Sequence, residues 1–125
     1  MAFAQLGKTA DAIKAYREAL QLNPDLVGAL LNLGWILAAD KNEKLRDGPE
    51  AVRLASHAVD ITQNKDASAF DLLAAAYAEN GKFPQATETA EKALSLAESN
   101  GPKPLAEQIQ ARLQLYKEGR SFRAQ

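Results

Sequence analysis

"GKTADAIKAYREALQLNP" occupies residues 7–24, and "GKFPQATETAEKALSLAE" occupies residues 81–98. Both stretches begin with Gly-Lys, carry an alanine five residues after the glycine and then reach an Ala-Leu pair. A third stretch, "GPEAVRLASHAVDIT" at residues 48–62, fills the same positions with Ala51 and an Ala-Val pair. Self-similarity at a fixed period is the signature of a repeat architecture. The sequence therefore predicts a stack of similar units.

The spacing between the copies gives the period of the repeat. Ala12 and Ala51 lie 39 residues apart, and Ala51 and Ala86 lie 35 residues apart. A period of 34 residues with insertions of five and one accounts for both distances. The longer insertion falls in "DKNEKLRDG", residues 40–48, which is charged and precedes a proline. Such a composition is typical of a loop, and we expect this one to be solvated.

Apolar periodicity and helix stop signals predict the helices themselves. A short helical stub is expected at residues 2–6, followed by helices at 10–22, 26–39, 49–62, 67–80, 84–97 and 105–118. Gly7 and Gly81 stand where one helix should end and turn back, because glycine tolerates the positive φ of such a turn. The last helix is expected to shield the end of the stack. Residues 119–125 are expected to form a frayed tail.

A 34-residue period of paired helices resembles the tetratricopeptide repeat family. One copy matches the whole pattern of that family, through Leu73-Ala74, Tyr77, Gly81, Ala86 and Ala93-Leu94. Two further matches are partial: Gly7, Ala12, Tyr16, Ala19-Leu20 and Pro24, and then Leu33-Gly34 with Leu37. The resemblance covers the chain from its start to about residue 98.

The resemblance implies an all-α fold, an antiparallel helix-pair solenoid of the tetratricopeptide type in a right-handed superhelix. The expected single domain, residues 1–125, contains a partial first repeat at 1–24, a second repeat at 25–64 with the loop insertion at 40–48, a third repeat at 65–98, a C-terminal capping helix at 103–118 and a tail at 119–125. It also implies a protein-interaction scaffold, because the first helices of such repeats line a concave groove that binds a peptide or helix of a partner.

The groove residues implied by the resemblance lie on the first helices of the second and third repeats. They are Leu31, Asn32, Trp35, Ala38, Asp71, Ala75, Ala78 and Glu79. Trp35 is the only tryptophan, and tryptophan is a frequent hot-spot residue of interfaces. The alternative is that Trp35 is a core residue under the loop at 40–48. Asp71 and Glu79 would favour a basic or polar donor on the ligand.

Composition argues against several other classes of protein. A net charge of -1 without a basic stripe argues against nucleic-acid binding. The absence of cysteine and the single histidine, His57, which we expect to be solvated, disfavour a metal site. No catalytic arrangement or cofactor motif is visible, so we expect neither an enzyme nor a cofactor. The apolar run at 26–39 is shorter than the ~20 residues of a membrane span, and no signal peptide is visible. The compartment, cytoplasmic or periplasmic, stays open.

Two alternative functions remain from the sequence. The chain begins inside a repeat, so it is expected to be a C-terminal repeat segment of a larger bacterial protein. Some large bacterial proteins with such repeats carry enzyme or membrane glycosyltransferase domains. The other alternative is a self-assembly unit. The incomplete first repeat should leave an apolar face uncovered, and a homodimer could cover it through Phe3, Leu6, Ile13 and Tyr16.

Overall fold

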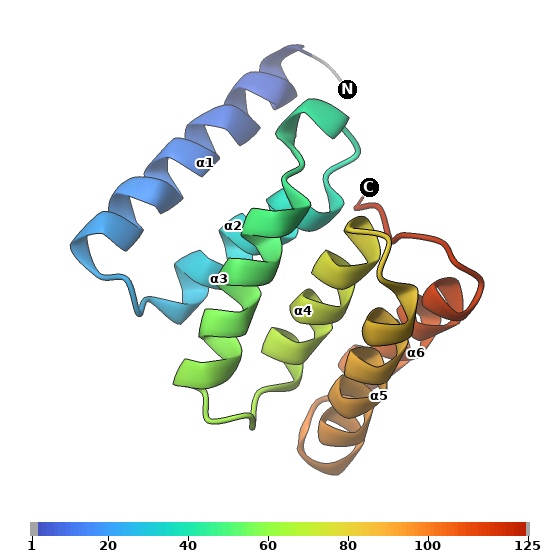
Figure 1. Cartoon of the computed structure of the whole chain (residues 1–125). Coiled ribbons are helices and arrows are strands. Elements are labelled where there is room, and N and C mark those ends of the chain that lie inside the picture. Colours follow the sequence, from blue (N-terminus) through green and yellow to red (C-terminus); the bar gives the residue numbers. More distant parts are fainter. Residues whose placement is uncertain (1–2, 125) are drawn as a thin grey trace.

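Six α-helices and one short 3₁₀ helix make up the part of the chain that the computed structural model describes, namely the backbone of residues 3–124 and the side chains of residues 7–124. They are α1 (Phe3–Leu22), α2 (Val27–Ala39), η1 (Glu43–Leu45), α3 (Gly48–Ile61), α4 (Ala67–Glu79), α5 (Phe83–Asn100) and α6 (Lys103–Lys117). Within these ranges there is no β-strand. Figure 1 shows consecutive helices side by side, from α1 at one end of the stack to α6 at the other. The predicted all-α helical solenoid is confirmed.

Helix α2 is apolar on nearly every side because it has three helical neighbours. It packs against α1, α3 and α4. Leu30, Leu33 and Leu37 are buried in the main core, whereas Asn32, its one polar side chain, is exposed. Two of these three neighbours, α3 and α4, follow α2 in sequence. Of the described helices, none combines the length and apolarity that a membrane crossing requires.

Side-chain caps and one glycine set the boundaries of the central helices. The side chain of Asp47 accepts a hydrogen bond from the Glu50 amide at 3.1 Å, and that of Asp66 accepts one from the Ser68 amide at 2.9 Å. Both satisfy amides that lack a partner at a helix start. Gly81, with φ at +76°, ends α4 and turns the chain into α5. The turn predicted at Gly81 is confirmed.

Helix α1 differs from the prediction, because it runs without a break from residue 3 to residue 22. The predicted stub at 2–6 and separate helix at 10–22 are wrong for the described residues, and Gly7 lies inside the helix. A Cβ at Gly7 would meet no atom within 4 Å, so no tertiary contact forces a turn there. Interior glycine costs only about 1 kcal/mol relative to alanine, and good helix formers on both sides outweigh that cost.

Helix α1 is attached to the stack by a partly buried apolar face and by one ion pair. Ile13, Tyr16 and Leu20 pack against the main core. Arg17 donates two hydrogen bonds to the carboxylate of Glu50 on α3, at 2.7 and 3.0 Å. These bonds lower the pKa of Glu50, although partial burial opposes the shift. A two-point guanidinium–carboxylate contact fixes orientation as well as distance.

The contact between α2 and α4 depends on the absence of a side chain at Gly34. A Cβ placed there would lie 2.5 Å from the Cδ2 atom of Leu72, which is itself fully buried. Leu72 therefore fills the space that a larger residue at position 34 would need. Gly28, on the same helix, has no atom within 4 Å of its Cβ position.

We expect these two glycines to respond oppositely to alanine. Gly34→Ala should lower the free energy of unfolding by about 1 kcal/mol or more, because overpacking at Leu72 outweighs the gain in helix propensity. Gly28→Ala should raise it by about 0.5–1 kcal/mol, since only the propensity changes. Urea unfolding followed by circular dichroism measures both. Equal effects of the two substitutions would show that the α2–α4 contact is looser than described.

Candidate functional site

The predicted groove residues lie on α2 and α4, and α6 joins the same face through Arg112. Their exposure falls into three groups: exposed Asn32; half-buried Leu31, Trp35 and Glu79; and buried Ala38, Asp71, Ala75 and Ala78. The two helices that carry these residues pack against each other, and the small residues among them are buried. A contact of these residues with a ligand stays a prediction.

The chain after α6 covers this face, contrary to the frayed tail expected at residues 119–125. We call residues 119–124 the C-terminal segment. The hydroxyl of Ser121 donates to the carbonyl oxygen of Ala78 at 3.1 Å, and the amide of Ala124 donates to that of Ala39 at 2.8 Å. In Figure 1 the red segment runs from α6 past the end of α4. The expectation failed because it considered the tail alone, whereas its docking surface comes from three helices.

An aromatic–cation cluster lies at the centre of this contact. The rings of Trp35 and Phe122 meet edge to face, with centroids 6.0 Å apart and planes at 82°. The guanidinium carbon of Arg112 lies 5.0 Å from the Trp35 ring centroid and 4.5 Å from that of Phe122. Both geometries are favourable for aromatic and cation–π contacts. Trp35 thus contacts the chain's own C-terminal segment through Phe122.

Asp71 holds Arg112 in place beneath the rings. Arg112 Nη1 lies 2.5 Å from Asp71 Oδ2, and only 4% of the Asp71 side chain is exposed. Burial raises the pKa of Asp71 to about 6, although the charge and hydrogen bond of Arg112 oppose this shift. Within the described part of the chain, Asp71 Oδ1 and the hydroxyl of Tyr116 are buried without hydrogen-bond partners. Unpaired buried polar atoms cost free energy, which explains why the charged carboxylate is disfavoured.

Glu79 connects the loop, α4 and the C-terminal segment. Its carboxylate pairs with Arg46 of the loop, with Nε to Oε2 at 3.1 Å, and with Arg123, with Nη2 to Oε1 at 2.8 Å. Arg46 also donates to the carbonyl oxygen of Asp40 at 2.7 Å. The expectation of a merely solvated loop at 40–48 was therefore wrong for Arg46, which is only partly exposed.

Sequence reasoning missed four residues of this site, namely Arg46, Arg112, Phe122 and Arg123. One signal could have revealed the turn that brings the segment back. "YAENGKF" at 77–83 and "YKEGRSF" at 116–122 share Tyr, Glu, Gly and Phe in the same order. Gly119, with φ at +71°, ends α6 as Gly81 ends α4. Nothing in the repeat pattern marks Arg112, because its partners lie on other helices.

His57 is less solvated than expected. Its Nε2 atom lies 2.8 Å from Asp25 Oδ1, and 43% of its side chain is exposed. This pair joins α3 to the turn between α1 and α2. Among residues 3–124, no group of three or more His, Cys, Asp or Glu side chains is placed to hold a metal ion.

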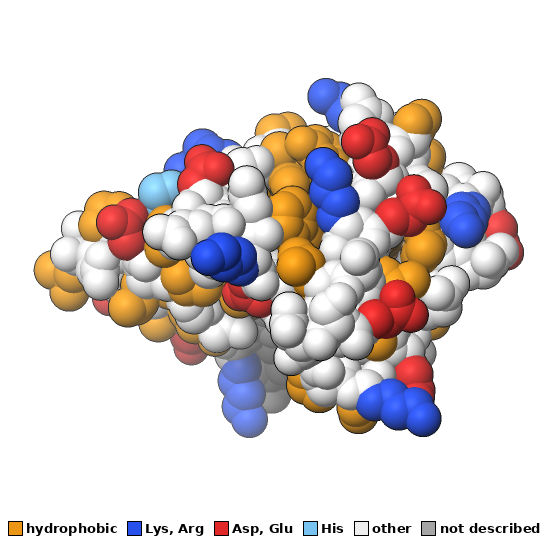
Figure 2. Space-filling view, turned by 90° about the horizontal axis from the view of Figure 1, so that it is seen from below, with side chains coloured by type: hydrophobic (Ala, Val, Ile, Leu, Met, Phe, Trp, Pro, Cys, Tyr) orange, Lys and Arg blue, Asp and Glu red, His pale blue; other side chains and the backbone are white. Residues whose placement is uncertain are grey.

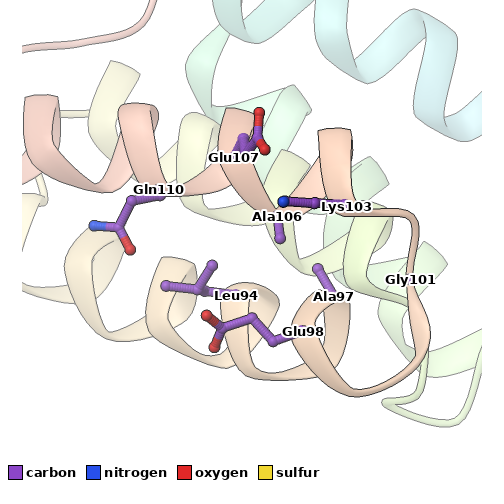
Figure 3. A pocket seen from close by; sticks show the side chains of 8 residues that line it. All are labelled: Leu94, Ala97, Glu98, Gly101, Lys103, Ala106, Glu107 and Gln110. Atoms are coloured by element: carbon purple, nitrogen blue, oxygen red, sulfur yellow. The ribbon is translucent and has the colours of Figure 1, made fainter.

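Away from this face, an open cavity of about 510 Å³ lies between α5 and α6 (Figure 3). Leu94, Ala97 and Ala106 line it, with polar and charged side chains that include Glu98 and Lys103. None of these belongs to the predicted site. Figure 2 shows positive and negative side chains interspersed with hydrophobic ones on the face that it displays.

We expect Asp71 to make the stability of the fold depend on pH. Its pKa is about 6 in the folded chain against an ordinary value of 3.8, so between these values the folded chain holds more protons than the unfolded chain. We compare the free energy of unfolding of the wild type with that of Asp71→Asn. The difference, wild type minus variant, should fall by up to about 3 kcal/mol as pH rises from about 4 to about 6. Above about pH 6 it should stay constant. Urea titrations of both proteins across this range measure the difference. A difference that rises with pH would contradict the raised pKa.

Comparison with known protein families matches two parts of the chain. A family model described as "TPR repeat" matches residues 2–40, and one described as "Tetratricopeptide repeat" matches residues 67–100. Comparison with curated proteins and with solved structures gives no match. The two matched ranges together cover more than half of the chain, and they include α1, α2, α4 and α5. Such repeats generally mediate protein–protein interactions and are typically non-catalytic. The chain belongs to the tetratricopeptide repeat family.

Proposed function

We propose that this chain is an interaction module that binds a short peptide segment of a partner protein on the face formed by α2, α4 and α6. The observation that carries the proposal is the way a non-helical stretch of the chain already lies on this face. That stretch uses one aromatic ring, one hydroxyl, one cation and one backbone amide. A partner peptide can offer the same groups.

The ends of α2 and α4 supply part of the recognition. The last carbonyl groups of a helix lack intrahelical partners, and they give this end a partial negative charge. The carbonyl oxygens of Ala39 and Ala78 accept hydrogen bonds here from groups outside their helices. Glu79 adds a full negative charge beside them. The face therefore favours a ligand that carries hydrogen-bond donors and a cation.

Trp35 supplies the apolar part of the recognition. Tryptophan is enriched among the residues that dominate binding energy, because it buries a large rigid surface. Here its ring is half-buried and lies beside Arg112, so an aromatic side chain of a ligand can contact both groups at once. Leu31 and exposed Asn32 extend the surface along α2.

Alanine substitution tests the role of Trp35. Peptides that bind the chain are selected from a random display library, and their dissociation constants are measured by calorimetry. Trp35→Ala should weaken binding by about 2 kcal/mol or more while circular dichroism stays helical. Phe70→Ala is the matched control, because Phe70 is a half-buried aromatic residue that lines a different groove, beside Lys92 and Leu96 of α5. An equal loss of peptide affinity in the two variants would mean that the peptide does not bind at Trp35.

Self-association is a second proposal, and it concerns α1. Ile13 and Tyr16 are only partly buried, and Leu22 near the same end of the stack is 90% exposed. The other two residues expected in a dimer, Phe3 and Leu6, have side chains outside the described residues. Partly covered apolar residues on a terminal helix favour a two-fold contact between copies.

Light scattering tests the dimer. We expect a mass near twice that of one chain at micromolar concentration. The substitution Ile13→Glu should reduce the mass to that of a single chain. Because Ile13 also packs against its own core, circular dichroism must show that the variant is folded. A monomer mass for the unmodified chain across the concentration range would exclude this contact.

A further inference from the structure

The turn at the end of α6 directs the C-terminal segment back over the stack. The amide of Gly119 donates to the carbonyl oxygen of Tyr116 at 3.0 Å, and that of Arg120 donates to Leu115 at 2.9 Å. With the positive φ of Gly119, these two bonds form a Schellman motif, which ends a helix and fixes the direction of the following chain. The path of the segment is thus set by local structure before any contact with α4 or α2.

The contacts of the segment are few and shallow. Ser121, Phe122 and Arg123 are each only partly buried, and Ala124 is exposed. Each uses a different interaction: a hydroxyl bond to Ala78, a ring contact with Trp35, an ion pair with Glu79 and an amide bond to Ala39. This pattern is that of a docked peptide, whereas the residues of the core pack on all sides.

The face beneath is organised independently of the segment. Asp71 holds Arg112 through an ion pair to which the segment contributes nothing. Glu79 keeps Arg46 as a second cation partner when Arg123 leaves. Release of the segment would therefore expose the Trp35 and Arg112 surfaces already placed to receive another ring, so little reorganisation is needed before binding.

We propose that the C-terminal segment is an intramolecular ligand, which occupies the site of the partner peptide and must leave before that peptide binds. The inference rests on the proposed function and adds two features to it. The first is the chemistry of the partner, a non-helical peptide in which an aromatic residue is followed by a basic one. The second is regulation, since occupancy of the site by the chain itself lowers the apparent affinity for any partner.

The size of this effect follows from the tether. A segment joined by a short linker competes at an effective concentration on the order of millimolar. If the free peptide binds the open face with a dissociation constant of about 100 μM, the tethered segment occupies the site in about ten elevenths of the molecules. A partner of the same chemistry would then bind the intact chain about 10-fold more weakly than a chain without the segment.

The experiment compares the intact chain with a chain that ends at residue 119. The probe is a dye-labelled synthetic peptide with the sequence of residues 120–125, RSFRAQ, and fluorescence anisotropy measures its binding. We expect saturable binding to the shortened chain, at least about 10-fold weaker binding to the intact chain, and none of the peptide RSARAQ to either. Emission from Trp35, the only tryptophan, should shift to longer wavelength in the shortened chain and return when the peptide is added.

Substitutions in the intact chain keep the test valid if the shortened chain does not fold. Phe122→Ala should open the site, raise the affinity for RSFRAQ and shift the Trp35 emission, with helical content unchanged. Arg120→Ala is the matched control, because the Arg120 side chain is 68% exposed and its only described ion pair is with Glu118. It should behave as the unsubstituted chain does.

The outcomes separate this inference from the proposed function. Equal affinity of intact and shortened chains would refute the competition, although a peptide site on this face would remain. No binding of RSFRAQ to a folded open chain would refute the segment as a ligand, whereas peptides selected through Trp35 would still support the interaction module. A concentration-dependent dimer whose mass falls with Phe122→Ala would mean that a second copy supplies the segment, and it would refute the intramolecular arrangement.

Discussion

Close approach of antiparallel helices is the constraint on which the rest of the structure depends. Alanines on α3 and α5 are almost completely buried, among them Ala51, Ala58, Ala86 and Ala93. Small side chains at these positions allow neighbouring backbones to approach, while Leu33 and Leu72 supply the volume that fills the core. Because each pair packs in the same way, the same faces of α2 and α4 point to one side of the stack. The arrangement of Trp35 and Asp71 on one face is a consequence.

Much of this architecture could be predicted from the sequence, because its determinants are local or periodic. The helix predicted at 49–62 lies at Gly48–Ile61, and the one predicted at 67–80 lies at Ala67–Glu79. Both begin after an aspartate that caps the helix, and the turn between α4 and α5 has the glycine that its positive φ favours. Residues that recur at the repeat period occupy equivalent positions in the stack, and the recurring alanines Ala51 and Ala86 are both buried.

The site was less predictable, because its decisive contacts have no counterpart in the other repeats. Trp35 and Phe122 are 87 residues apart in sequence, and Asp71 and Arg112 are 41 apart. Periodicity indicates which face of a helix a residue lies on, and Trp35 and Asp71, which the family resemblance assigned to one face, both contact Arg112. It does not indicate which residues outside the repeats contact that face. The error at Gly7 has the opposite origin, since a family position was followed where no tertiary contact enforces a turn.

The hydrogen bond from Ala124 to Ala39 has a consequence for how the molecule unfolds. In a linear array each unit contacts only its neighbours, so the ends can open separately and cooperativity declines along the stack. Here the last residues of the chain bond to α2, which lies near the opposite end of the order of helices. This link adds a long-range coupling to a nearest-neighbour system. While the C-terminal segment is docked, opening of α6 also breaks this bond to α2, so two helices that are not neighbours in the stack are coupled.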